Sequence, residues 1–89
     1  MRRVLSGAVL LAFLSLAACA EPPNKEMDQA QGAIDAARAV GAEQYAPAEF
    51  TAATSTLAQS HEAVAQRDYR LALNHALESR EHAQNAARE

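Results

Sequence analysis

The sequence predicts an all-α fold, a small up-down-up three-helix bundle that follows a cleaved signal helix. Alanine supplies 23 of the 89 residues, and there is no Trp and only two Tyr and two Phe. Alanine favours helices, whereas strands are rich in β-branched and aromatic residues. Apolar residues recur at helical spacing in three segments joined by short connections, and such connections make neighbouring helices antiparallel.

The composition also excludes several kinds of functional site. A single Cys excludes an internal disulfide framework and a multi-cysteine zinc site. The formal net charge of −3 argues against nucleic acid as a partner. No Gly-rich phosphate loop and no Ser near an obvious His–carboxylate arrangement is found. We therefore expect no enzyme, no cofactor and no small-molecule substrate.

Residues 1–18 are predicted to be a secretory signal peptide. Arg2 and Arg3 precede an uncharged apolar run at residues 4–16, and small residues follow it. The run has about 13 residues, whereas a membrane span needs roughly 20. A permanent transmembrane helix is therefore the weaker interpretation.

The end of this segment, Leu-Ala-Ala-Cys at residues 16–19, resembles the bacterial lipobox. That resemblance implies cleavage between Ala18 and Cys19, diacylglycerol on the Cys19 sulfur, and an acyl chain such as palmitate on the new amino terminus. The alternative is an ordinary signal peptide that contains a Cys. Ala20 follows where enterobacterial lipoproteins of the inner membrane carry Asp, so the resemblance implies an outer-membrane anchor facing the periplasm.

The mature chain is expected to have a lipidated, Pro-rich tether at residues 19–24 and a helical domain at 25–89, with helices at about 25–40, 47–66 and 69–88. In the first helix Asn24 is the expected N-cap, and Gly41 is the expected C′ residue. Gly32 inside it costs up to about 1 kcal/mol against Ala unless it permits close packing. The predicted inner face is Met27, Ala30, Ile34 and Ala37.

The second helix has a strong start signal. Pro47 suits the first helical position, and Glu49 falls where it can reach back to the Ala46 amide. Tyr45 and Phe50 occupy the two positions of a hydrophobic staple. The predicted inner face is Phe50, Ala53, Leu57, Ser60 or His61, and Val64.

The third helix is expected to start after a cap at Asp68, with an apolar stripe of Tyr69, Ala72, Leu73, Ala76, Leu77, Ala83 and Ala87. Large apolar residues are few, so the core is thin. Self-association or a partner helix would add buried area.

Two resemblances concern the helical domain. Tyr45-Ala46-Pro47-Ala48-Glu49, together with Asp68-Tyr69, resembles an uncharacterised domain of small proteobacterial lipoproteins, found in some members ahead of an OmpA-type domain. It covers about residues 26–87 and implies a fold and a compartment but no activity. The segment at residues 67–73 is similar to the turn of a tetratricopeptide hairpin, with Arg67 in place of the usual Gly.

Histidines are the remaining candidates for chemistry. His75 and His82 lie two turns apart on the third helix with Glu78 between them, a spacing that allows a surface metal site. The competing interpretation is solvated histidines with a Glu78–His82 pair worth a few tenths of a kcal/mol. Metal binding is the weaker of the two.

These observations predict a non-enzymatic, lipid-anchored interaction or adaptor module of the cell envelope, with a protein partner or self-association. The alternative is a self-associating structural lipoprotein similar to the murein lipoprotein. Gly41 and Pro47 argue against that alternative, because they interrupt the unbroken helix that it requires. A periplasmic metal-binding role is a further, weaker alternative.

Overall fold

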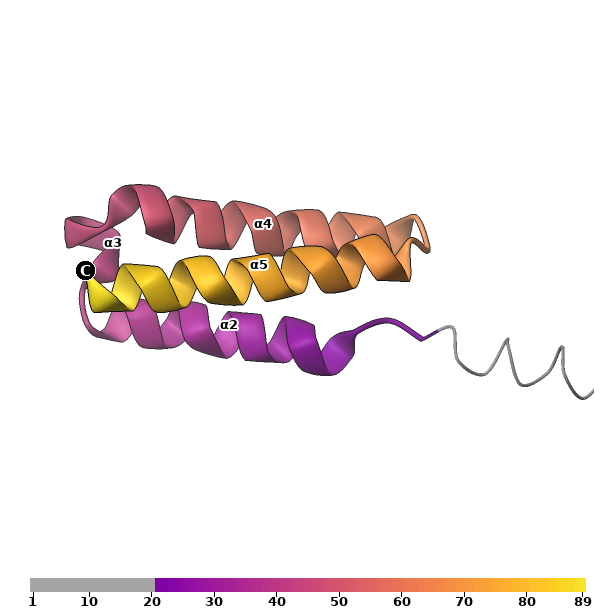
Figure 1. Ribbon diagram of the computed structural model, residues 1–89, viewed down its shortest axis with the longest axis horizontal. Helices are drawn as coiled ribbons and strands as arrows, with labels where there is room; N and C mark the ends of the chain where they lie inside the picture. Colours follow the sequence, from indigo (N-terminus) through magenta and orange to yellow (C-terminus); the bar gives the residue numbers. More distant parts are fainter. Residues whose placement is uncertain (1–20) are drawn as a thin grey trace, which may run out of the picture.

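The computed structural model describes residues 21–89, and in this part of the chain it contains only helices and their connections (Figure 1). The helices are α2 (Asn24–Ala39), α3 (Ala42–Tyr45), α4 (Pro47–Ala65) and α5 (Tyr69–Arg88). α2 and α5 run in one direction and α4 runs in the other. The predicted all-α, up-down-up bundle is confirmed, and the single turn α3 is an unpredicted addition. The predicted signal peptide, Ala18 and Cys19 lie outside the described residues.

α2 buries the face that the sequence predicts: Met27, Ala30, Ile34 and Ala37. Its start differs from the expectation, because Asn24 is already helical, Pro23 is the capping position, and no side chain caps the helix. Gly41 ends the segment as expected, in the left-handed conformation with φ of +86°. Its N–H donates to the Arg38 carbonyl oxygen at 3.0 Å.

The α3 turn changes the start of α4. The Ala46 N–H donates to the Ala42 carbonyl oxygen at 2.8 Å, so the amide that Glu49 was expected to reach is already satisfied. The predicted capping box is therefore wrong. Tyr45 was expected to close the core with Phe50, but its side chain is 46% exposed. Its hydroxyl donates to the Ala87 carbonyl oxygen at 3.3 Å, which links α3 to the end of α5.

α4 and α5 are joined by a tight turn at residues 66–68. Arg67 adopts a left-handed conformation with φ of +59°, at the position where related turns carry Gly. The Asp68 carboxylate accepts a hydrogen bond from the Leu71 N–H at 3.2 Å and caps α5, as expected.

The seam between α4 and α5 is built from small residues. The buried α5 residues are Ala72, Ala76, Ser79, Ala83 and Ala86. Ser60 and Ser79 are both fully buried. The Ser60 hydroxyl donates to the Ala72 carbonyl oxygen, and the Ser79 hydroxyl donates to the Ala53 carbonyl oxygen, each at 2.7 Å. These reciprocal bonds fix the register of the two helices at close range.

The packing of small residues between α4 and α5 differs from the predicted inner faces of both helices. Leu77 and Ala87 were expected inside, but both are exposed, and Ser79 and Ala86 are buried instead. On α4, Ser60 is the inward residue and His61 is exposed. The inner face of α5 is thus selected by side-chain size rather than by hydropathy.

None of the helices in residues 21–89 is long and apolar enough to cross a lipid bilayer.

Candidate functional site: a groove between α2 and α4

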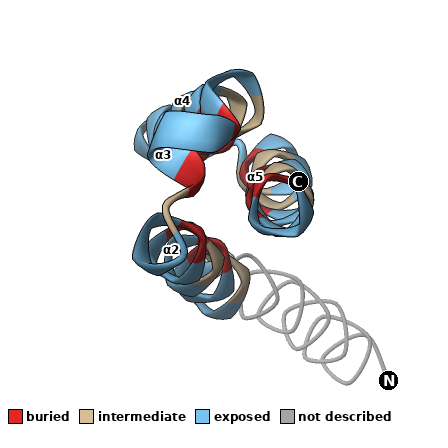
Figure 2. Cartoon of the chain, turned by 90° about the vertical axis from the view of Figure 1, so that its left-hand side faces the viewer, coloured by how far each residue is buried: buried red, intermediate tan, exposed pale blue. Residues whose placement is uncertain are grey.

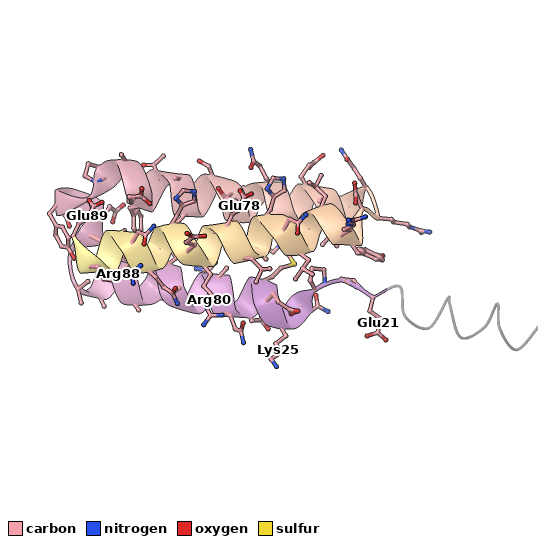
Figure 3. All side chains as sticks on the ribbon, viewed as in Figure 1. Glu21, Lys25, Glu78, Arg80, Arg88 and Glu89 are labelled. Atoms are coloured by element: carbon pink, nitrogen blue, oxygen red, sulfur yellow. The ribbon has the colours of Figure 1, made fainter. Side chains whose placement is uncertain are left out.

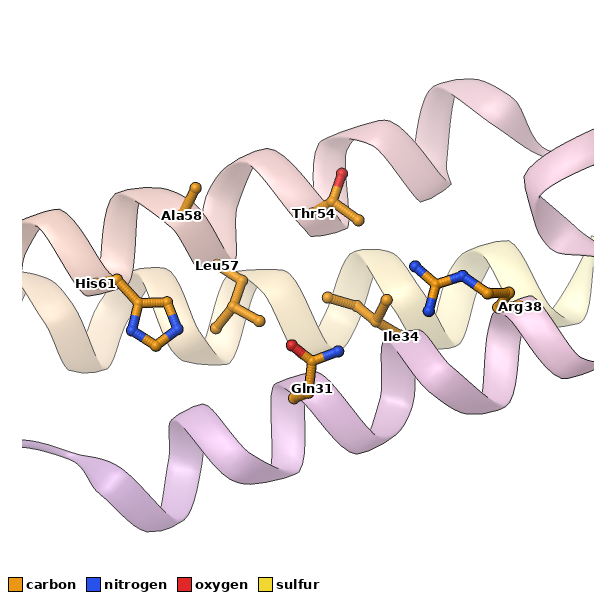
Figure 4. A pocket seen from close by; sticks show the side chains of 7 residues that line it. All are labelled: Gln31, Ile34, Arg38, Thr54, Leu57, Ala58 and His61. Atoms are coloured by element: carbon orange, nitrogen blue, oxygen red, sulfur yellow. The ribbon is translucent and has the colours of Figure 1, made fainter.

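α5 packs against both other long helices, whereas the contact between α2 and α4 is the least extensive of the three. Figure 2 looks along the bundle, with α2, α4 and α5 at the three corners of a triangle. A groove of about 260 Å³ lies between α2 and α4. It is lined by Gln31, Ile34 and Arg38 of α2 and by Thr54, Leu57, Ala58 and His61 of α4 (Figure 4).

The floor of the groove is apolar. Ile34 is 2% exposed and Leu57 is 5% exposed, so both belong to the core as well as to the groove. The α4 wall presents the small side chains of Thr54 and Ala58, which allow a close approach from outside. The groove therefore combines an apolar floor, closed by core side chains, with a polar rim.

Arg38 closes one end of the groove. Its guanidinium lies over the Phe50 ring, 5.3 Å from the ring centroid. It also pairs with Asp35 at 3.4 Å and with Glu43 at 3.9 Å. These contacts hold the arginine side chain in place, and the two carboxylates outnumber its single positive charge.

Two polar side chains of the groove, Thr54 and Gln31, are engaged with the protein's own helices. The Thr54 hydroxyl donates to the Thr51 carbonyl oxygen at 3.0 Å, and the Gln31 amide donates to Asp35 at 3.0 Å. A nucleophile needs a base within hydrogen-bonding reach. The only bond found for the Thr54 hydroxyl is to a backbone carbonyl. The arrangement is suited to recognition by shape and charge.

The predicted metal candidates are not gathered into one site. His82 Nδ1 lies 2.9 Å from Glu49 Oε2, so His82 bridges α5 to α4. His75 Nδ1 lies 3.9 Å from Glu78 Oε2. The expected Glu78–His82 pair is therefore replaced by two separate pairs. No group of three or more metal-binding side chains forms within residues 21–89.

Residues 25–89 match the model of a protein family described as a domain of unknown function, DUF4398. The chain belongs to this family. No curated protein and no solved structure matches the chain. The expected domain of unknown function is thus confirmed, and its description assigns no activity.

In this DUF4398 domain the distinctive motif residues shape the two ends of the bundle. Tyr45, Ala46 and Pro47 form the corner from α3 into α4, where Tyr45 contacts the end of α5. Asp68 and Tyr69 start α5 at the opposite end, and Tyr69 is half-buried. Their roles in the structure are those of helix starts and connections, and none of them lines the groove.

Sequence reasoning did not identify the groove. It assigned Ile34 and Leu57 to the core, but it did not indicate that α2 and α4 stand apart above them. The available signal was the pair of serines at 60 and 79. Placed on facing helices, these predict a close α4–α5 pair that leaves α2 attached mainly to α5.

Proposed function

We propose that this protein is a bacterial lipoprotein anchored through Cys19 in the outer membrane, with its DUF4398 domain facing the periplasm. The domain acts as a non-enzymatic interaction module that binds a helix of an envelope protein in the α2–α4 groove. The observation that carries the proposal is the open groove whose apolar floor is formed by Ile34 and Leu57.

The groove favours a helix over a small molecule. Its volume of about 260 Å³ accommodates a few side chains, which is below the usual range for small-molecule sites of about 300–1,000 Å³. Two antiparallel helices with an apolar strip between them are the surface on which amphipathic helices dock. A helix seated there completes a four-helix arrangement and covers the floor of the groove.

The anchor is supported by the sequence at residues 16–19 and by the spacer that follows it. Pro22 and Pro23 favour an extended chain between Cys19 and the start of α2. Each buried methylene contributes about 0.8 kcal/mol, so two or three acyl chains hold a protein on a membrane stably. Intact-mass measurement of the mature protein tests this step. A Cys19→Ser variant is expected to lack the lipid mass and to leave the membrane fraction.

A pair of matched variants tests the groove. Ala58→Arg places a long side chain over the groove, whereas Ala48→Arg makes the same change at an exposed α4 position outside it. The tagged, lipidated protein is crosslinked in cells, and captured proteins are identified by mass spectrometry. We expect Ala58→Arg to reduce capture of the dominant partner about tenfold or more, because a loss of about 1.4 kcal/mol in binding free energy weakens binding tenfold. Ala48→Arg should leave capture unchanged. Equal capture by both variants would remove the groove from the proposal.

A further inference from the structure

α4 and α5 form a hairpin that is held together by bonds of fixed direction. The Ser60 hydroxyl donates to the Ala72 carbonyl oxygen at 2.7 Å. The Ser79 hydroxyl donates to the Ala53 carbonyl oxygen, also at 2.7 Å. The contact between these two helices is the most extensive in the bundle. The hairpin therefore has the features of a cooperative unit that keeps its structure when other contacts are lost.

α2 is attached to this hairpin mainly by apolar contacts. Its buried face consists of Met27, Ile34 and two alanines. Its contact with α5 is smaller than the contact between α4 and α5, and its contact with α4 is smaller still. The Arg38 guanidinium lies over the Phe50 ring of α4, but Arg38 is half exposed, so water weakens that attraction. Apolar contacts have no fixed direction, and they permit a helix to leave as one body.

The sequence of α2 also makes this helix weak by itself. Gly32 lies in its interior, and a Cβ there would meet nothing within 4 Å, so packing does not require the glycine. No side chain caps the start of the helix. Glu26 Oε2 is buried without a hydrogen-bond partner within residues 21–89, and unwinding returns that oxygen to water. A helix of 16 residues with these features unwinds once it loses its neighbours.

The break between α2 and the rest of the domain falls at Gly41. This residue has φ of +86°, and the single turn α3 follows it. α3 stays with the hairpin, because the Tyr45 hydroxyl donates to the Ala87 carbonyl oxygen at 3.3 Å. Figure 3 shows Glu21 at one end of the bundle and Glu89 at the other. The connection from α2 to the other helices lies at the end near Glu89.

We propose that α2 is a releasable strap, which undocks from the α4–α5 hairpin as a unit and pivots at Gly41 while the hairpin keeps its structure. The groove then has a fixed wall, α4, and a movable wall, α2. Undocking uncovers Leu57, which is 5% exposed when α2 is docked and shares the groove floor with Ile34. The inference goes beyond the proposed function, because the motion occurs whether or not a helix binds in the groove.

Hydrogen exchange of the intact protein, followed amide by amide by NMR, tests the inference. Amides that exchange through one shared opening have a common protection factor. We expect the protected amides of α2 to share a protection factor about tenfold or more below that of the slowest amides in α4 and α5. Equal protection in the three long helices would show that they open together, and it would refute the strap.

A variant that weakens only the hairpin separates the two kinds of opening. In Ser79→Ala the slowest amides of α4 and α5 should lose about two- to tenfold in protection, as the loss of one neutral hydrogen bond predicts. The α2 amides should be unchanged, because the hairpin is folded both before and after α2 undocks. A loss of the same size in α2 would mean that α2 opens only with the whole domain, which overturns the inference.

Arg67→Gly is the complementary variant, because it stabilises the hairpin instead of weakening it. Arg67 has φ of +59° in the turn between α4 and α5, a conformation that glycine adopts readily. The protection of the slowest α4 and α5 amides should rise, and that of α2 should stay the same. A rise of the same size in all three helices would again contradict the release of α2 alone.

Gly32→Ala is the control for α2 itself. Because α2 is unwound both in its own release and in complete unfolding, the slowest amides of all three helices should gain about two- to fivefold in protection. Unchanged α2 amides would show that they exchange without unwinding of the helix. Protection that falls gradually toward Asn24, with no shared value, would show fraying from one end. Either result refutes the strap.

Discussion

Replacing Ser60 or Ser79 with leucine tests whether α4 and α5 approach each other so closely that only small side chains fit between them. The alternative is a loosely packed core with room for a larger side chain. In a loosely packed bundle a buried leucine would be favourable by about 1.5–3 kcal/mol. In this structure both serines are 0% exposed and each hydroxyl lies 2.7 Å from a backbone oxygen of the facing helix. The two descriptions therefore predict effects of opposite sign.

The magnitude follows from two contributions. Overpacking a filled site costs about 1–3 kcal/mol, and loss of a neutral hydrogen bond costs about 0.5–1.5 kcal/mol. The acceptor carbonyl oxygens of Ala53 and Ala72 lie within helices and keep their helical bonds, so no buried group is left unpaired. We expect each leucine variant to be destabilised by about 2–4 kcal/mol.

Thermal unfolding followed by circular dichroism measures the effect. For a domain of this size each kcal/mol shifts Tm by about 4–8 °C, so a fall of about 8 °C or more is expected. Ser55→Leu is the control, because Ser55 is exposed on the same helix and should change stability by less than about 0.5 kcal/mol. A higher Tm for Ser60→Leu or Ser79→Leu would show that the helices do not approach as closely as described, and the seam argument would fail.

Three further predictions are each measured by the same unfolding assay. A Cβ at Gly32 would meet nothing within 4 Å, so Gly32→Ala should stabilise by about 0.5–1 kcal/mol, and a loss would contradict the open surroundings. Gly41 and Arg67 both have positive φ. Gly41→Ala should therefore lower the free energy of unfolding by about 1–2 kcal/mol, and Arg67→Gly should raise it. Opposite signs would argue against the left-handed conformation at these two positions. A double-mutant cycle on Glu49 and His82, each about one-third exposed, should give a coupling below about 1 kcal/mol, and a larger value would indicate a more buried pair.

The part of the fold that sequence predicts best is α2. Its only large apolar residues are Met27 and Ile34, and their spacing places them on one face together with Ala30 and Ala37. The cap at Asp68 and the left-handed Gly41 were equally accessible, because local backbone geometry decides both. Each of these features depends on neighbours in the sequence and not on the packing of the other helices.

The features that sequence missed depend on packing between helices. Hydropathy favoured Leu77 as an inward residue of α5. Ser79 is buried between α4 and α5 instead, because its side chain is small and its hydroxyl donates to the Ala53 carbonyl oxygen. The four-residue helix α3 is too short to show a period, and it satisfied the amide expected to bind Glu49. The groove also escaped prediction, because it arises from which pairs of helices pack closely.

The small seam and the candidate site have a common origin. With alanine and serine between α4 and α5, the larger side chain of Leu77 is left on the outside of the bundle. The same pairing leaves α2 attached mainly to α5 and opens the groove over Ile34 and Leu57. The close α4–α5 seam and the groove between α2 and α4 therefore follow from the same choice of helix pairs, because the side chains that let α4 and α5 approach closely are also those that leave α2 with few contacts to α4.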